Sequence, residues 1–543
     1  MVIPYTSIFT YLLPRPKVDA NLYSIKKEFL VFSKIDIVIC ILLILIAIAT
    51  FYKFSSYPLP VGYDTPIYLG GAKVFVEKGI KCLDLSRLLL YRGIYTTLLG
   101  FILLIIRDEI ILGKFLWLQI TLIIVANYVL ISRITNSKIT GFISSLIWIF
   151  WKRTSRLLWD LHSNTFGIFL LLLSYFVLMY AINKKSKKVL FVFIILLFNI
   201  WFIHRLTFIV GFITFLSFLI IDVYFYRNSV ILQILKIDNP ILKKVFKLIA
   251  LSSPLLLFLF SYITIKGLRL APLLSYAARD LLRKWWPEIP IWNINKFVSH
   301  LGGWIVFLLA ECGALYLLLY SHKNAFYNLL FIHLTASLLM NQNFLFGLHA
   351  LPERFAVYSF MPIYSSLGIY FISKKAKSFV KIVRIKVIFK QTCYIIKGKI
   401  FGEVFPILLL GILLTFIMPA QFEAIDRYKP TITIEEYNAM VYLRDNFLCF
   451  VEIGRSHLVV LPRWGLEYWI KAVMADCLKA VDVRVMQKPT LKILQVYLDK
   501  YDTIYLFNLK VKYFETIADS PFFRSITIRY SNITIQIISK NDL

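Results

Sequence analysis

A single carboxylate, Asp64, lies in a turn rich in proline and glycine, directly after the first long apolar run of the chain. The stretch PLPVGYDTPIYLGGAKVFVEKG covers residues 58–79. An aspartate at the mouth of a membrane span can act as a general base, or bind a divalent cation through its oxygens. The structural alternative is a helix N-cap, since Thr65 and Pro66 follow. The two roles are compatible, and Asp64 is our catalytic candidate.

Four further segments place ionisable side chains beside apolar runs: 151–167, 199–208, 279–290 and 348–368. Ionisable groups at membrane depth are costly, and they commonly bind substrates or ions. Guanidinium and imidazole groups suit an anionic ligand such as a lipid phosphate. The structural alternatives are interfacial loops, snorkelling side chains and an amphipathic surface helix. The candidates for binding substrate or phosphate are Asp160, His162, His204, Arg205, Arg279, Arg283 and Arg354.

The sequence lacks motifs that would by themselves indicate a catalytic or metal site. It has no Walker A loop, no G-x-S-x-G, no H-E-x-x-H and no dinucleotide fingerprint. This disfavours an ATP-driven pump and an enzyme with a cytosolic Rossmann domain. The six cysteines lack metal-ligand spacing, and Cys449 and Cys477 could form an extracytoplasmic disulfide or stay buried thiols. We assign no metal ligands, and a role for Mg²⁺ or Mn²⁺ stays open.

The composition indicates a polytopic membrane protein. Hydrophobic residues make up 59% and charged residues 17% of the 543 residues, against roughly 45–50% and about 25% in soluble domains. The basic residues that give the net charge of +31 lie between apolar runs. The expected partners are therefore anionic membrane lipids and not nucleic acid. The first apolar run is long enough to span and lacks a small-residue cleavage site, so we expect no cleavable signal peptide.

Eleven apolar segments predict membrane-spanning helices. They are 35–54, 111–132, 139–151, 163–183, 189–203, 206–226, 247–265, 301–320, 325–340, 355–372 and 402–419. The stretch 94–106 has only 13 residues, about 20 Å as a helix, and we expect it to be re-entrant or interfacial. The positive-inside rule then places the N-terminus in the cytoplasm and the C-terminus outside. The basic segments on the cytoplasmic side are 15–34, 184–188, 227–247 and 374–399.

The predicted fold is an all-α polytopic membrane bundle with a small extracytoplasmic α/β domain at its C-terminus. In that domain, Thr433 and Glu436 form a capping-box pattern that predicts a helix start, and WGLEYWIKAVMADCLKA predicts a second helix. The segments SHLVVLP, DTIYLFNL and SITIRYSNITIQII predict strands from their β-branched content and alternation. The predicted parts are a cytoplasmic segment 1–34, a transmembrane domain 35–419 with a first external loop 55–110, and an outer domain 420–543.

These segments together resemble the GT-C superfamily of membrane glycosyltransferases, which includes protein mannosyltransferases, aminoarabinose transferases and oligosaccharyltransferases. VGYDTPIYLGGAKVFVEKG looks like the family's first external loop, with its essential acid at Asp64. IHRLTFIVGF is similar to a His-basic-Leu-Thr run of archaeal members, and LHSNTFGIFLLLLSYFVL to the segment that enters a middle span. LPERFAVYSFMPIYSSLGIYF resembles an arginine-containing late span, with Arg354, and TIEEYNAMVYLRDN resembles the opening of the outer domain.

The resemblance implies an enzyme of the cell membrane that takes a sugar from a polyprenyl-phosphate donor on the outer face. The acceptor would be a lipid, a glycan or a protein, and Asp64 would be the general base of an inverting transfer. Many members have a second acid beside the first, whereas Tyr63 and Thr65 flank Asp64 here. The Trp-Trp-Asp signature of oligosaccharyltransferases is missing from the tail, which favours transfer of a single sugar.

Two other functions compete with this interpretation. A transporter or flippase for an anionic lipid or lipid-linked sugar would also use outer cations, without bond chemistry. The outer domain and the lack of an internal sequence repeat speak against it. A non-catalytic scaffold is the third possibility, with the outer domain as a binding module.

Overall fold

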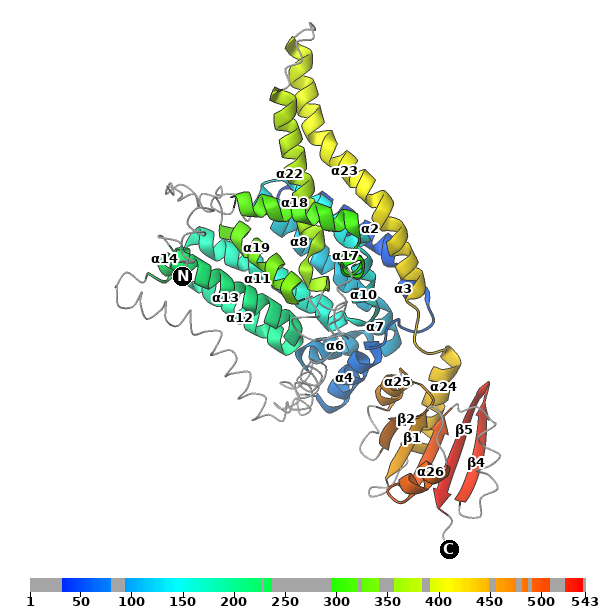
Figure 1. The fold of residues 1–543 in the computed structure, drawn as a ribbon. Helices are drawn as coiled ribbons and strands as arrows, with labels where there is room; N and C mark the ends of the chain where they lie inside the picture. Colours follow the sequence, from blue (N-terminus) through cyan, green and yellow to red (C-terminus); the bar gives the residue numbers. More distant parts are fainter. Residues whose placement is uncertain are drawn as a thin grey trace, which may run out of the picture.

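The computed structural model describes residues 32–79, 93–225, 229–236, 294–320, 325–340, 356–382, 391–448, 456–463, 465–474, 481–486, 491–507 and 523–540. Figure 1 shows a large helical body, with a small sheet-containing domain at the C-terminal end. Several sequence predictions lie outside the described residues. They are the span 247–265, the phosphate-binding candidates Arg279, Arg283 and Arg354, and the pair Cys449 and Cys477.

The first helices of the body follow the apolar runs of the sequence. Polar caps set several of their starts: the Ser33 side chain caps α2, and the Ser137 hydroxyl accepts the N–H of Thr140 at 3.2 Å at the start of α9. The bounds are α2 (Lys34–Phe51), α3 (Lys53–Ser56), α4 (Thr65–Lys78), α6 (Gly93–Ile106), α7 (Glu109–Phe115), η3 (Leu116–Gln119), α8 (Ile120–Thr135), α9 (Lys138–Phe150) and α10 (Lys152–Asp160).

The remaining helices complete the body. They are α11 (His162–Lys184), α12 (Lys187–Ile203), α13 (Arg205–Phe225), α14 (Val230–Leu235), α17 (Ile294–Leu301), α18 (Trp304–Tyr320), α19 (Ala325–Met340), η5 (Val357–Ser359), α22 (Met361–Ile382) and α23 (Gln391–Arg427). Helices α18 and α22 cross at Gly313 and Gly368, where an added Cβ would lie 2.0 Å from a carbonyl oxygen of the other helix. Small residues of this kind let helix backbones approach closely in membranes.

Within the described residues, five helices are long and apolar enough to cross a membrane: Lys34–Phe51, Glu109–Thr135, His162–Lys184, Arg205–Val223 and Val404–Arg427. Shorter apolar helices coincide with further predicted segments, at Gly93–Ile106, Lys138–Phe150, Trp304–Tyr320 and Phe326–Leu338. The chain is therefore a helical membrane protein. The number of crossings, eleven, and the orientation of the termini stay predictions.

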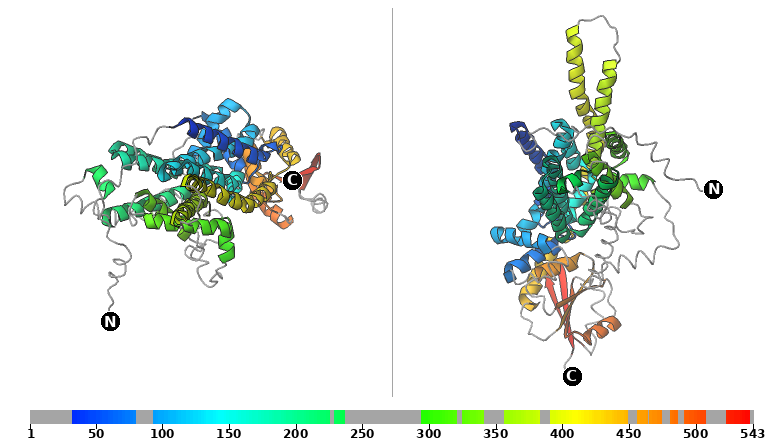
Figure 2. Two further views of the ribbon diagram at one scale, coloured as in Figure 1. Left: turned by 90° about the horizontal axis from the view of Figure 1, so that it is seen from above. Right: turned by 90° about the vertical axis from the view of Figure 1, so that its left-hand side faces the viewer.

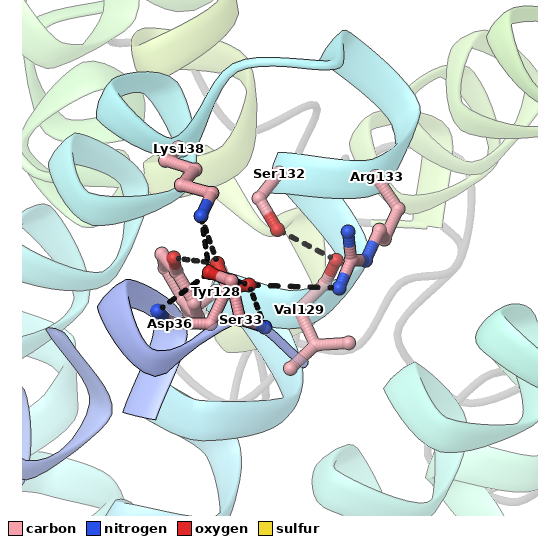
Figure 3. Close-up of polar contacts among 7 residues, drawn as sticks. All are labelled: Ser33, Asp36, Tyr128, Val129, Ser132, Arg133 and Lys138. Carbon is pink, nitrogen blue, oxygen red and sulfur yellow. Dashed lines mark hydrogen bonds and ion pairs between the residues drawn. The ribbon is translucent and has the colours of Figure 1, made fainter. Parts of the chain in front are cut away.

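A buried carboxylate ties the first span to its neighbours at the start of α2 (Figure 3). Asp36 accepts hydrogen bonds from the Tyr128 hydroxyl at 2.7 Å and from the Ser33 hydroxyl at 2.8 Å. The Lys138 ammonium lies 3.4 Å away and the Arg133 guanidinium 3.8 Å away. Because Tyr128 and Arg133 lie on α8 and Lys138 opens α9, the cluster fixes α2 against both helices.

The C-terminal domain has a five-stranded mixed sheet in the order β2-β1-β3-β5-β4. Strand β1 pairs in parallel with β2 and β3, and β5 pairs antiparallel with β3 and β4. Successive residues of β1 alternate between two apolar cores, so both faces of its central strands are covered. The elements are α24 (Ile434–Leu443), η6 (Arg444–Leu448), β1 (His457–Leu461), α25 (Leu466–Val473), β2 (Val481–Val485), α26 (Leu491–Leu498), β3 (Thr503–Phe507), β4 (Phe523–Tyr530) and β5 (Ile533–Lys540).

The elements predicted for this domain are found, with two additions. The capping box is confirmed: the Thr433 hydroxyl accepts the Glu436 N–H at 3.2 Å, and the Glu436 carboxylate accepts the Thr433 N–H at 3.0 Å. The predicted strands coincide with β1, β3, β4 and β5. Helix α25 covers Leu466–Val473 of the second predicted helix, and residues 475–480 of that prediction lie outside the described residues. Strand β2 and helix α26 were not predicted. Helix α23 continues to Arg427, past the boundary predicted at residue 419.

The C-terminal end of α22 and the N-terminal end of α23 project together from one end of the helical body, and the C-terminal domain lies at the opposite end (Figures 1 and 2). Helices α4 and α6 lie at the end that faces the C-terminal domain (Figure 1). The Trp159 ring stacks on Tyr428 with centroids 5.0 Å apart, and the Trp159 indole N–H donates to the Lys429 carbonyl at 3.2 Å. Leu59 is buried in the core of the C-terminal domain. The first loop and α10 therefore form the surface on which this domain packs.

Candidate functional site

Asp64 occupies the N-cap position of α4, but its side chain makes no capping hydrogen bond. Its backbone has φ −88° and ψ −10°, whereas capping residues are typically extended. Asp108, the N-cap of α7, is extended, and its carboxylate accepts the N–H groups of Ile110 and Ile111 at 2.8 and 2.9 Å. The Asp64 residue is only 8% exposed. The N-cap alternative therefore accounts for the position of Asp64 before α4, but capping is not the role of its carboxylate.

Gly62 fixes the turn that carries Asp64. It has φ +110°, and an added Cβ would lie 1.6 Å from the carbonyl oxygen of Trp159. Only glycine fits this combination of backbone angle and close approach. The turn expected from the prolines and glycine thus lies directly against the last turn of α10.

A buried hydrogen bond joins the start of α4 to the start of α11. The Thr65 hydroxyl donates to the Val61 carbonyl at 2.6 Å and lies 3.0 Å from Nε2 of His162. Since the hydroxyl proton is used on Val61, the His162 Nε2–H is the donor to Thr65. One turn along α4, the Tyr68 hydroxyl lies 3.0 Å from the Ser163 hydroxyl. Thr65 and His162 are 0% and 1% exposed.

His204 and Arg205 lie at the break between α12 and α13. His204 is extended, with φ −156° and ψ 105°, and Arg205 is the first residue of α13. The Arg205 guanidinium lies 5.4 Å from the centre of the Trp201 ring, a cation–π contact. Gly167 of α11 lies directly against His204. Both side chains are half-buried.

The structure brings several predicted residues to one end of the body. Asp64 is the N-cap of α4, His162 opens α11, and Asp160 is the last residue of α10. An apolar cluster that includes Tyr68 and Ile203, with Phe166 packed against it, joins α4 and α11 to the end of α12, next to His204 and Arg205. This end faces the C-terminal domain (Figure 1). Arg279, Arg283 and Arg354 lie outside the described residues.

Neither a protein-family model nor a curated protein matches the sequence. Solved structures do match. The apo oligosaccharyltransferase of Archaeoglobus fulgidus has a TM-score of 0.58 at 12% identity, over 87% of this chain and 69% of that one. The Archaeoglobus fulgidus oligosaccharyltransferase AglB, in complex with an inhibitory peptide and a dolichol-phosphate, has a TM-score of 0.56 at 13% identity over the same shares. The mycobacterial arabinofuranosyltransferase AftD has a TM-score of 0.52 at 11% identity, over 94% of this chain and 40% of that one.

The chain has the GT-C fold. The resemblance inferred from the loops is thus confirmed at the level of the fold. Identities this low establish architecture and leave activity to be argued from the residues themselves.

The C-terminal domain contributes further residues to this end of the GT-C fold, and the sequence analysis did not predict them. The Tyr63 ring meets the Tyr468 ring edge-on, with centroids 5.4 Å apart. Burial, and next the negative charges of Glu467 and Asp64, raise the pKa of Tyr63 and raise the pKa of Tyr468 to about 12. Glu467 is therefore a second carboxylate that acts on the same pair of tyrosines as Asp64. In the sequence each of these tyrosines stands next to an acid, Tyr63 beside Asp64 and Tyr468 beside Glu467. Their contact is visible only in the fold, because they lie far apart in the chain.

Among the described residues, no group of three or more His, Cys, Asp or Glu side chains is placed to hold a metal ion. Asp64 could contribute carboxylate oxygens to a divalent cation, but no full ligand set accompanies it in that part of the chain. We therefore derive no step through a metal.

Proposed function

We propose that the protein is a GT-C membrane glycosyltransferase that transfers a single sugar from a polyprenyl-phosphate donor to an acceptor hydroxyl. The observation that carries the proposal is the buried, non-capping carboxylate of Asp64 beside the C-terminal domain of a GT-C fold. One structural neighbour was solved with a dolichol-phosphate and a peptide, which supports a lipid-linked donor and a separate acceptor.

In the proposed reaction, Asp64 accepts the proton of the acceptor hydroxyl. The acceptor oxygen forms a bond to the anomeric carbon as the bond from that carbon to the phosphate oxygen breaks. The polyprenyl phosphate leaves with the electron pair. A single displacement inverts the anomeric carbon, and the step balances with the donor, the acceptor and Asp64.

Negative charge develops on the leaving phosphate, and preorganised donors would stabilise it. We assign this role to His204 and Arg205, which lie together at the α12–α13 break. Arg279, Arg283 and Arg354 are further phosphate-binding candidates, proposed from the sequence alone. His162 holds Thr65 next to Asp64, and Asp160, two residues earlier, is a candidate contact for the sugar.

The acceptor is a lipid, a glycan or a protein on the outer face of the cell membrane. The missing Trp-Trp-Asp signature in the tail favours transfer of one sugar over transfer of a preassembled oligosaccharide. The proposed orientation has the N-terminus in the cytoplasm and the C-terminal domain outside, from the distribution of basic segments.

A transfer assay tests this function. Purified full-length protein is mixed with radiolabelled polyprenyl-phosphate sugars and a panel of lipid, glycan and peptide acceptors. We expect label in one acceptor, and an NMR spectrum of the product with the anomeric configuration opposite to that of the donor. Retention of configuration would contradict the single displacement. Donor binding without transfer to any acceptor would contradict the enzyme and indicate a carrier of lipid-linked sugar.

A further inference from the structure

A completely buried histidine, His333, lies in the middle of α19 with both ring nitrogens hydrogen-bonded. Its Nε2 lies 2.8 Å from the carbonyl oxygen of Tyr358. A carbonyl can only accept, so Nε2 carries the proton. Nδ1 then accepts from the Tyr175 hydroxyl at 2.8 Å. The imidazole is therefore neutral and held as a single tautomer between α11 and the turn at Tyr358.

Tyr358 connects His333 to His204, because its carbonyl contacts His333 and its hydroxyl contacts His204. Its hydroxyl lies 3.1 Å from Nδ1 of His204 and 3.2 Å from the hydroxyl of Thr207. The backbone N–H of Thr207 donates to the same Nδ1 at 3.3 Å. A backbone N–H can only donate, so Nδ1 of His204 is an acceptor. The proton of the neutral ring is then on Nε2, the nitrogen that can donate to a phosphate oxygen.

The turn that carries Tyr358 is held rigidly. Phe360 follows it with φ +50°, which is unfavourable for a bulky side chain and persists only where packing enforces it. Its ring stacks on His333 with centroids 4.4 Å apart and meets Trp148 at 5.9 Å. Tyr358 and Phe360 are both 0% exposed. The turn therefore has little freedom to move His204.

We infer that these side chains form a positioning device for the donor phosphate. The histidine chain, defined as Tyr175, His333, Tyr358, Thr207 and His204, fixes His204 in the Nε2–H tautomer and in one orientation. His333 and Tyr358 do not touch the substrate and act through His204. This inference rests on the proposed function, in which His204 binds the phosphate of the donor.

The first test compares two buried tyrosines. Tyr358→Phe removes a hydroxyl of the histidine chain, and Tyr364→Phe removes a hydroxyl that donates to the Leu330 carbonyl at 2.8 Å, outside the chain. The measurements are the dissociation constant for polyprenyl phosphate and, as a control without the headgroup, for the uncharged polyprenol. We expect Tyr358→Phe to weaken phosphate binding by roughly three- to tenfold and to leave polyprenol binding unchanged. Tyr364→Phe should change neither.

The second test asks whether the hydrogen bond from His333, and not its volume, matters. His333→Gln keeps an N–H donor for the Tyr358 carbonyl, whereas His333→Leu removes it. We expect the glutamine variant to bind polyprenyl phosphate more tightly than the leucine variant. With the labelled donor, the loss should appear in the donor KM and in kcat, because His204 also stabilises the charge that develops on the leaving phosphate, and not in the acceptor KM.

Three results would overturn the inference. They are equal effects of Tyr358→Phe and Tyr364→Phe, equal effects on polyprenol and polyprenyl phosphate, and wild-type protein that does not bind polyprenyl phosphate. The binding measurement needs no turnover, so it is separate from the proposed function. Wild-type protein that binds polyprenyl phosphate through the histidine chain but transfers no sugar would refute the enzyme and keep the positioning role.

Discussion

Replacing Gly62 with alanine should detach the Asp64 turn from α10. The backbone angle of φ +110° at Gly62 costs a residue with a Cβ about 1–3 kcal/mol. The new Cβ would also lie 1.6 Å from the Trp159 carbonyl oxygen, and overpacking costs about 1–3 kcal/mol. The sum, about 2–6 kcal/mol, exceeds the roughly 0.5–1.5 kcal/mol that the Thr65–His162 hydrogen bond contributes. The turn should therefore move and Asp64 with it.

The assay for Gly62→Ala is the initial rate of sugar transfer, with the unfolding temperature measured on the same samples. A displaced base should slow transfer by at least about tenfold, the equivalent of 1.4 kcal/mol. Gly303→Ala is the matched control, because Gly303 has φ +99° but an added Cβ there has no atom within 4 Å. It shares the backbone strain without the clash. Equal rates and unfolding temperatures for the two variants would refute the reasoning.

Three further predictions concern the site and its supports. Thr65→Val leaves the buried His162 N–H without its acceptor, which costs about 1–3 kcal/mol of stability. The unfolding temperature and the transfer rate should both fall, and unchanged values would contradict the Thr65–His162 hydrogen bond. Asp36→Asn removes the negative charge that lies 3.4 Å from Lys138, at the end of α2 far from the Asp64 turn. The unfolding temperature should therefore fall while the donor KM stays unchanged. A raised donor KM would contradict the prediction that Asp36 has a structural role only. The pKa of Tyr468 is raised from 10.0 to about 12, so its contribution to stability is present below pH 10 and is lost between pH 10 and 12. Alkaline unfolding curves should therefore differ between wild type and Tyr468→Phe, and coincident curves would contradict the burial.

Much of the fold could be predicted because membrane helices need long apolar runs and the strands of the C-terminal domain are rich in β-branched residues. The capping box at Thr433 located α24 to the residue. Strand β2 was missed although its five residues, VDVRV, alternate between valine and a charged residue, as expected for a half-exposed strand at the sheet edge. Helix α26 has only eight residues, too few for a clear period, so its packing in the domain supplies what the local sequence lacks.

The candidate site was predictable as separate segments and not as an arrangement. Asp64, His162 and His204 stood out because ionisable groups next to apolar runs are costly. Nothing local shows that Thr65 bonds to His162, 97 positions away, or that Tyr468 meets Tyr63. His333 was overlooked because a lone histidine within an apolar run commonly belongs to a satisfied core. Its role depends on the Tyr358 carbonyl, which the sequence does not mark.

The most direct measurement for the account compares Asp64→Asn with Asp108→Asn in the transfer assay and in donor binding. Asparagine caps a helix about as well as aspartate, so a residue that only caps should tolerate the change. Asp108 caps α7 through two N–H groups, and its variant should keep full activity. For Asp64→Asn we predict transfer slower by about 10²–10⁴-fold with donor binding retained, as expected for loss of a general base. Wild-type transfer rates in Asp64→Asn would contradict the central claim.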